Sequence, residues 1–116
     1  MHLANISDGG LFQPRDIAST LRTSTEEVGL TVGLGKDAVQ RRARIASTKT
    51  QQRLRALVEV INKVQPRFGS ALIAYAWFRS EPLAGFDGRT AMQLVQDGQA
   101  QAVLDYIDAV DAGVYS

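Results

Sequence analysis

The sequence contains no cysteine, one histidine and one tryptophan, and it has no long hydrophobic run. Without cysteine the chain has neither disulfides nor thiolate zinc ligands, which is compatible with a reducing cytoplasm. His2 is the only histidine, which argues against metal sites with two imidazoles and against a Ser/His/Asp triad. No run approaches the roughly 18 apolar residues of a membrane span, and no signal peptide is visible. We therefore expect a soluble, cytoplasmic protein.

Motifs for cofactors and catalysis are also missing. Gly35–Lys36 resembles the end of a phosphate loop, but Leu30 stands where the first glycine belongs and Asp37 replaces the Ser/Thr that binds magnesium. Three aspartates near the C-terminus recur every three residues, and a solvated acidic helix face explains them better than a metal site. They are Asp105, Asp108 and Asp111. We predict no cofactor, no metal and no enzymatic activity.

Charge is distributed unevenly along the chain. Residues 1–68 hold eleven Lys and Arg against six Asp and Glu, a net of +5, whereas residues 69–116 hold two against six, a net of −4. Between Lys36 and Arg67 nine basic residues face two acidic ones. This asymmetry favours a basic surface for a polyanion and an acidic half with another task, although a solvated helix surface would give the same count.

Hydrophobic periodicity predicts helices throughout and no convincing strand. After a loose leader over residues 1–10, Pro14 suits the start of a first helix, and Ser24 or Thr25 can cap a second. Further helices are expected over 36 to about 45, from Thr50 to an end at Pro66 and Gly69, and over 71–78 and 90–95. A last helix is expected from the stripe Val103, Leu104, Ile107 and Val110. The longest one has a stripe at i, i+3, i+4 and i+7, namely Leu54, Leu57, Val58, Ile61 and Val64. We predict an all-α bundle of about seven short helices.

Residues 25–42 have the organisation of a helix-turn-helix. A short helix ends at Gly33-Leu34-Gly35, and a second helix follows. Either glycine can adopt the positive φ of the turn, Leu34 would fill the space between the helices, and Val39 would anchor the second helix. Gly29 and Gly33 are unfavourable inside a helix unless close packing requires them.

The outward side of this second helix carries side chains that suit DNA. Arginine can contact guanine, glutamine can contact adenine, and lysine can neutralise phosphate. The candidate DNA-binding residues are Lys36, Gln40, Arg41 and Arg44. Arg53 and Arg55 either add phosphate contacts or are ordinary surface residues. A degenerate helix-turn-helix that only mediates dimerisation has the same pattern.

The last third of the chain has an ordered series of features without catalytic groups. Trp77-Phe78 leads to Glu81-Pro82-Leu83-Ala84-Gly85, and Gly88-Arg89-Thr90 starts a short helix that Gly98 stops. A helix with an apolar stripe follows, and the chain closes on Gly113-Val114-Tyr115-Ser116. Trp77 is either a core aromatic or an anchor for a partner, and the tail is either a frayed end or an inserting segment.

In these features the chain resembles the Xre/MbcA/ParS family of type II antitoxins. The likeness runs from about Val64 to Tyr115, and the N-terminal half fits the Xre-like helix-turn-helix of such proteins. It implies a division into residues 1–65, the helix-turn-helix domain, and residues 66–116, the toxin-binding domain. Family members often have proline after the Arg-Thr pair, whereas Ala91 stands here.

The resemblance also implies a function. Family members bind RES-domain toxins, which consume NAD or transfer ADP-ribose, and occlude the NAD pocket with their C-terminal region. Many also bind their own operator DNA. The positions that would face the toxin are Trp77, Arg89, Gly113, Val114, Tyr115 and Ser116. The chain would form a homodimer or a hetero-oligomer with the toxin. A stand-alone transcriptional regulator with a helix-turn-helix is the alternative.

Overall fold

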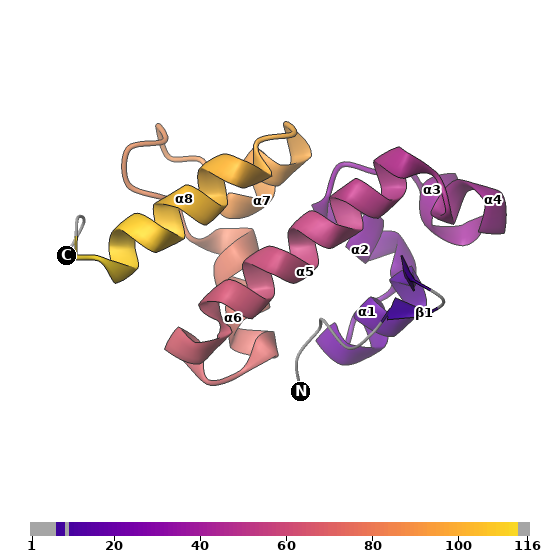
Figure 1. Cartoon of the computed structure of the whole chain (residues 1–116), viewed down its shortest axis with the longest axis horizontal. Coiled ribbons are helices and arrows are strands. Elements are labelled where there is room, and N and C mark those ends of the chain that lie inside the picture. The colour runs from indigo at the N-terminus through magenta and orange to yellow at the C-terminus, as the bar shows by residue number, and fades with distance from the viewer. Residues whose placement is uncertain (1–6, 9, 114–116) are drawn as a thin grey trace.

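Short apolar runs bounded by caps and glycines fold into helices in residues 7, 8 and 10–113, the part of the chain that this computed structural model describes (Figure 1). The eight helices in this part are α1 (Pro14–Leu21), α2 (Thr25–Thr31), α3 (Lys36–Gln40), α4 (Arg42–Ile45), α5 (Thr48–Phe68), α6 (Ala71–Ser80), α7 (Ala91–Gln96) and α8 (Ala100–Asp111). The all-α prediction is confirmed.

Two short strands lie where the sequence predicts a loose leader. β1 (Ser7–Asp8) pairs antiparallel with β2 (Leu11–Phe12). Gly10 has a φ of 84°, a conformation that glycine adopts without strain, and it turns the chain between the strands. Gln51 of α5 holds β2 in place, because its side chain accepts a hydrogen bond from the Phe12 N–H at 2.8 Å and donates one to the Phe12 carbonyl at 3.0 Å.

The longest helix, α5, runs through the middle of the molecule and contacts α4, α6, α7, α8 and β2 (Figure 1). Its apolar stripe packs in the core as predicted, with no member more than 2% exposed: Leu54, Leu57, Val58, Ile61 and Val64. Helices from both halves of the chain therefore pack on one element. The proposed boundary between residues 65 and 66 lies within α5, and the division into two domains stays a prediction.

The start of α5 differs from the prediction, whereas Gly69, one of the two residues expected to end it, is its C-cap. Ser47 rather than Thr50 is the N-cap, because the Ser47 hydroxyl accepts a hydrogen bond from the Thr50 N–H at 3.3 Å. At the other end the helix continues through Pro66 and stops at Gly69, which has a φ of 74°. A proline this close to a helix end removes one hydrogen bond, and the half-buried Phe68 keeps the last turn packed against the core.

The helix predicted over 36 to about 45 is wrong in one respect, because it breaks at Arg41. That residue has an extended backbone, with φ −89° and ψ 126°, between α3 and α4. Val39 and Ile45 are six residues apart, so a straight helix would point them to different sides. The break allows Val39 to enter the core, while Ala43, four residues further along the chain, is exposed.

The C-terminal helices follow their local signals closely. Ser24 and Ser70 cap α2 and α6, and Thr90 forms a capping box with Gln93 at the start of α7. Helix α6 is buried on one side only, because Ala74, Tyr75 and Phe78 are in the core whereas Ile73 is 54% exposed. The helix predicted over 71–78 therefore contributes one face to the core.

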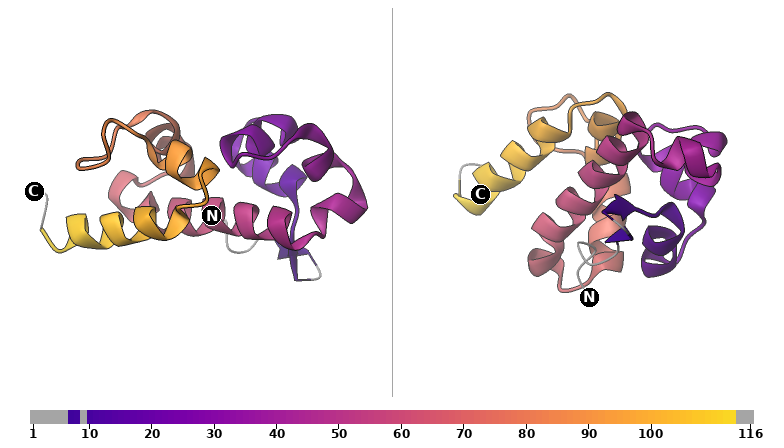
Figure 2. Two further views of the ribbon diagram at one scale, coloured as in Figure 1. Left: turned by 90° about the horizontal axis from the view of Figure 1, so that it is seen from above. Right: turned by 45° about the vertical axis from the view of Figure 1, so that its right-hand side comes forward.

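The molecule is elongated, with principal extents of 43 × 28 × 21 Å. Helices α3 and α4 lie at one end of its longest axis, and the α6–α7 loop and the end of α8 lie at the other (Figures 1 and 2). In the described residues no helix combines the length and the apolar character that crossing a membrane requires.

Candidate binding surfaces

The segment predicted to form a helix-turn-helix folds as α2, a turn and α3. Leu34 is 5% exposed and Val39 is 2% exposed, as expected for the residues that join the two helices. A Cβ added at Gly29 would lie 3.1 Å from a Val39 methyl carbon, so glycine allows α2 and α3 to approach. Gly33 has the positive φ of the turn, 78°, whereas Gly35 has a φ of −75° and caps α3.

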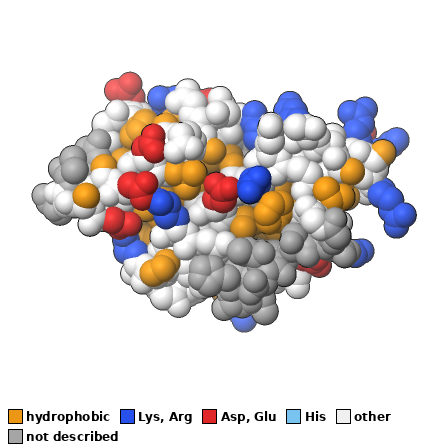
Figure 3. Space-filling model, viewed as in Figure 1, with side chains coloured by type: hydrophobic (Ala, Val, Ile, Leu, Met, Phe, Trp, Pro, Cys, Tyr) orange, Lys and Arg blue, Asp and Glu red, His pale blue; other side chains and the backbone are white. Residues whose placement is uncertain are grey.

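The four candidate DNA-binding residues are all exposed, but they do not lie on one recognition helix. Lys36 and Gln40 belong to α3, Arg41 lies in the break, and Arg44 belongs to α4. The Arg41 guanidinium forms an exposed ion pair with Asp37 at 3.6 Å. Within the described residues Lys36, Arg42, Arg44 and Lys49 have no ion pair, and Figure 3 shows Lys and Arg side chains gathered at this end.

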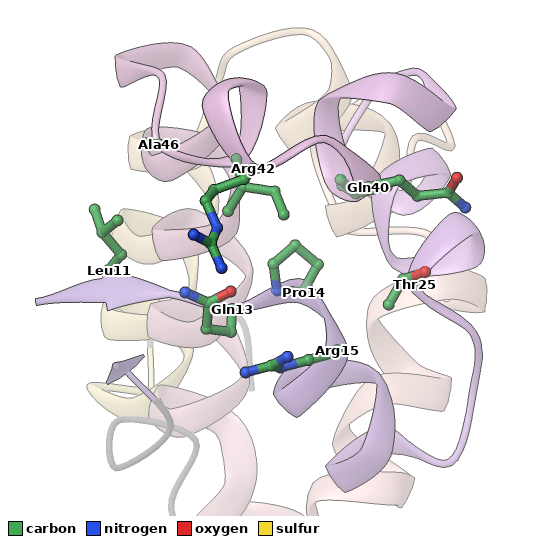
Figure 4. A pocket seen from close by; sticks show the side chains of 10 residues that line it. Leu11, Gln13, Pro14, Arg15, Thr25, Gln40, Arg42 and Ala46 are labelled. Carbon is green, nitrogen blue, oxygen red and sulfur yellow. The ribbon is translucent and has the colours of Figure 1, made fainter. Parts of the chain in front are cut away.

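A groove of about 620 Å³ separates α1 and β2 from α3 and α4. The groove is lined by the apolar side chains of Leu11, Pro14 and Ile45 and by the basic side chains of Arg15 and Arg42. Figure 4 shows the Arg42 guanidinium pointing toward Gln13, and Gln40 pointing away from the groove. Arg42 was missed by the sequence reasoning, which assumed a continuous helix and assigned that position no role.

Arg53 is a structural residue that joins the two halves of the chain. Its Nη1 donates hydrogen bonds to the carbonyls of Val32 at 2.8 Å, Val95 at 3.1 Å and Gln96 at 3.0 Å. The Gln96 side chain adds a bond to the Leu30 carbonyl at 2.8 Å. The guanidinium thus satisfies carbonyls at the ends of both α2 and α7. It is not the phosphate contact that the sequence left open.

Three other basic residues of α5 are paired with carboxylates. Arg55 pairs with Glu59 at 2.9 Å, Lys63 pairs with Asp108 at 2.7 Å, and Arg67 pairs with Asp111. The hydrogen bond that Lys63 donates to Asp108 is the main cause that raises the pKa of Lys63, and the charges of Asp108, Asp111 and Asp105 add to it while burial opposes it. The pairs of Lys63 and Arg67 join α5 to α8, so neither the basic nor the acidic charge of the sequence is fully available to partners.

The environment of Trp77 is intermediate between the two that the sequence left open, a core aromatic and an anchor for a partner. Its ring is half-buried and contacts Phe68, with ring centroids 6.1 Å apart. It therefore covers the end of α5 next to Arg67, which holds the end of α8. The structure thus brings Trp77 and the C-terminal end of α8 to the same end of α5.

Arg89 lies on a separate part of this half. Arg89 belongs to the loop between α6 and α7, in which Pro82 and Thr90 form an antiparallel β-bridge. Its Nε donates a hydrogen bond to the Phe86 carbonyl at 3.3 Å, and its guanidinium is 3.6 Å from Asp97. With its side chain 39% exposed, Arg89 fixes the loop and still presents part of its charge to solvent.

The predicted tail is only partly within the described residues. Gly113 ends α8 with a φ of 85°, and its N–H donates to the Val110 carbonyl at 2.9 Å. Val114, Tyr115 and Ser116 lie outside the described residues. Within residues 7, 8 and 10–113, no group of three or more His, Cys, Asp or Glu is placed to hold a metal ion.

With the geometry of this half in place, a comparison with known families becomes informative. Residues 63–113 match the family model of the antitoxin Xre/MbcA/ParS C-terminal toxin-binding domain. The match begins at Lys63 in α5, includes α6, α7 and α8, and ends at Gly113. It supports an antitoxin role for this chain. No curated protein and no solved structure gave a significant match.

Sequence reasoning therefore identified the half that matches the antitoxin family model and missed the side chains that organise it. Lys63 and Arg67 counted only toward a basic stretch, although their spacing of four places them on one face of α5. The aspartates of α8 recur on one face as well. Two facing helices with opposite charge at such spacing are a signal that could have suggested the pairs. No comparable local signal indicates the role of Arg53, since its three acceptors are far away in sequence.

Proposed function

We propose that this chain is the antitoxin of a type II toxin–antitoxin system, acts in the cytoplasm, and neutralises a RES-domain toxin. The match of residues 63–113 to the toxin-binding domain is the observation that carries the proposal. The identity of the toxin class rests on the resemblance described above. No catalytic role is assigned to the chain, and it acts by binding.

The proposed mechanism is steric occlusion of the toxin's NAD pocket. Helices α6, α7 and α8 pack on α5 and form a rigid platform, and α8 ends at Gly113 at one extreme of the molecule (Figure 1). A preorganised platform reduces the entropy lost when the partner binds. The residues assigned to the toxin contact are Trp77, Arg89, Gly113, Val114, Tyr115 and Ser116.

The test measures binding and inhibition with the cognate RES-domain toxin. The full chain should co-purify with the toxin and stop NAD consumption. Removal of residues 113–116 should weaken inhibition by about 30-fold or more, the size expected for a residue that dominates an interface. A matched variant that lacks residues 2–5 should inhibit normally. Full inhibition by the variant without residues 113–116 would contradict occlusion by the tail, and a lack of any complex would contradict the antitoxin role.

A second function, operator binding, is favoured by the unpaired basic side chains at the α3–α4 end. Lys36, Arg42, Arg44 and Lys49 are exposed, and Arg15 lines the same groove as Arg42. Because α3 is only five residues long, contacts to phosphates should dominate over reading of base edges. A dimer would place two such ends on two half-sites.

Operator binding is tested with DNA from the region upstream of the chain's own gene. Fluorescence anisotropy should show binding that weakens as salt increases, because each neutralised phosphate releases counterions. Equal affinity for this DNA and for a shuffled duplex would indicate non-specific attraction. Absence of binding to both at low salt would leave the α3–α4 end without this function.

A further inference from the structure

The end of α8 is held differently from the rest of that helix. Val103 and Ile107 are fully buried, and Ile107 is the last residue of α8 to reach the core. Beyond it, Val110 is half-buried, and Asp108, Asp111 and Ala112 are exposed. Apolar packing therefore fixes the first two turns of α8 more strongly than the last turn.

Two ion pairs hold this last turn to α5. The Lys63 ammonium lies 2.7 Å from an Asp108 carboxylate oxygen, and the Arg67 guanidinium donates to Asp111. Lys63 and Arg67 are one turn apart on α5, and their acceptors are one turn apart on α8, so the contacts run in parallel. The Lys63 side chain is 34% exposed and that of Arg67 is 31% exposed, so both are less exposed than the aspartates, at 63% and 56%.

We propose that Lys63 and Arg67 are positioning residues that hold the last turn of α8 on α5 and so fix where Gly113 lies. The inference rests on the proposed function, in which the C-terminal end of the chain contacts the toxin. Exposed ion pairs contribute little to global stability, so their value here is local. The pKa of Lys63, raised mainly by its hydrogen bond to Asp108, agrees with a pair that persists in the fold.

The first test needs no toxin. Hydrogen exchange of the double variant Lys63→Ala/Arg67→Ala should become faster at the amides of residues 108–113 and stay unchanged in α1, α2 and the middle of α5, because only the last turn of α8 opens more often. Arg55→Ala is the matched control, since it removes an exposed ion pair of α5 with Glu59 and leaves α8 untouched. Unchanged exchange at residues 108–113 in the double variant would overturn the proposal.

The second test measures affinity for the cognate RES-domain toxin. The double variant should bind about tenfold more weakly, an effect within reach of two such pairs, whereas Arg55→Ala should bind normally. The charge-swapped variant Lys63→Asp/Asp108→Lys should regain most of the affinity that Lys63→Asp loses alone. If the swap folds and restores nothing, the side chains contact the toxin directly and the positioning role is wrong.

The variant that lacks residues 113–116 separates failure of this inference from failure of the proposed function. Should it lose binding while the double variant binds normally, positioning is wrong and the tail contact stands. Should both bind normally, the tail contact itself is wrong and no positioning role remains.

Discussion

The two ends of the molecule differ in whether their charged side chains form ion pairs. At the α3–α4 end, Lys36, Arg42 and Arg44 face solvent without an ion pair, whereas at the α8 end Asp108 and Asp111 are paired with side chains of α5. A count along the sequence gives +5 and −4 for the two halves. Some of the basic and acidic side chains pair with each other between α5 and α8. The net charges of the two halves therefore do not give the charge that each surface presents to a partner.

The difference suggests separate tasks for the two ends. Unpaired, exposed cations attract a polyanion at long range and carry little shape information. Paired charges beside a half-buried tryptophan instead suit a surface of fixed shape. The junction between the halves, formed by α2, α5 and α7 around Arg53, fixes the position of one end of the molecule relative to the other. The predictions below test this junction first and the ends afterwards.

Arg53→Ala is expected to have the largest effect on stability. It removes three hydrogen bonds from one guanidinium to carbonyls of α2 and α7, and hydrogen bonds of charged groups contribute roughly 1.5–3 kcal/mol. The free energy of unfolding should fall by about 3 kcal/mol. Chemical denaturation followed by circular dichroism measures the change, and Arg55→Ala should lose less than about 0.5 kcal/mol. Similar losses for both variants would show that the junction does not depend on Arg53.

Gly33→Ala should destabilise the same junction by a smaller amount. The added Cβ would lie 3.0 Å from the Arg53 guanidinium and 3.2 Å from the Gln96 backbone, at a φ of 78°. We expect a loss of about 2 kcal/mol in the free energy of unfolding. Gly35→Ala is the matched control, because its φ is −75° and nothing lies within 4 Å of the added atom. Its stability should stay within about 0.5 kcal/mol of the original chain.

Arg42→Ala/Arg44→Ala should weaken binding to operator DNA by about tenfold at moderate salt, through loss of two phosphate contacts. The slope of log affinity against log salt should become shallower by about 2. Anisotropy titrations at several salt concentrations give both values. Arg41→Ala should change the slope less, because Arg41 pairs with Asp37. The opposite order would make Arg41, one of the four residues that the sequence predicts, the more important contact.

Tyr75→Phe should have the smallest effect and the opposite sign. The Tyr75 hydroxyl is buried and has no hydrogen-bond partner among the residues that the structure describes, so its removal should be neutral or stabilise the fold by up to about 1 kcal/mol.

The same residue predicts a loss of stability at alkaline pH. Burial raises the pKa of Tyr75 above its usual 10.0, although the nearby Thr31 hydroxyl and Arg79 lower it in part. Because the folded-state pKa of Tyr75 exceeds the unfolded one, the neutral Tyr75 side chain contributes its full share of stability below about pH 10. This share is lost as the pH rises through the folded pKa. Thermal melts between pH 8 and 11 should show a shallower alkaline decline for Tyr75→Phe than for the original chain. Parallel declines would exclude this cause.

Much of the fold could be predicted from local signals in the sequence. Ser24, Ser70 and Thr90 cap their helices through hydrogen bonds to residues two or three positions on, and the glycines at 33, 69 and 98 end helices through their own backbone freedom. The stripe of α5 needed only its 3.6-residue period. These features depend on neighbours in sequence, which is why they could be predicted.

The details of the candidate sites depended on partners far away in sequence. The break at Arg41 follows from how Val39 and Ile45 meet other elements, and it replaced one recognition helix with α3 and α4. Likewise Arg53 and Arg67 looked like any other surface cations until α7 and α8 supplied their acceptors.

The sequence by itself determined an all-α chain, the places where most helices begin and end, the two short helices around a glycine turn and the likeness to an antitoxin domain. Each of these depends on residue type and short-range spacing. Only the tertiary structure decided which charges remain available to partners and which join α5 to its neighbours. The reason is physical, since a charged side chain acquires its role from the acceptor it meets, and that acceptor is chosen by the packing of helices rather than by the order of residues.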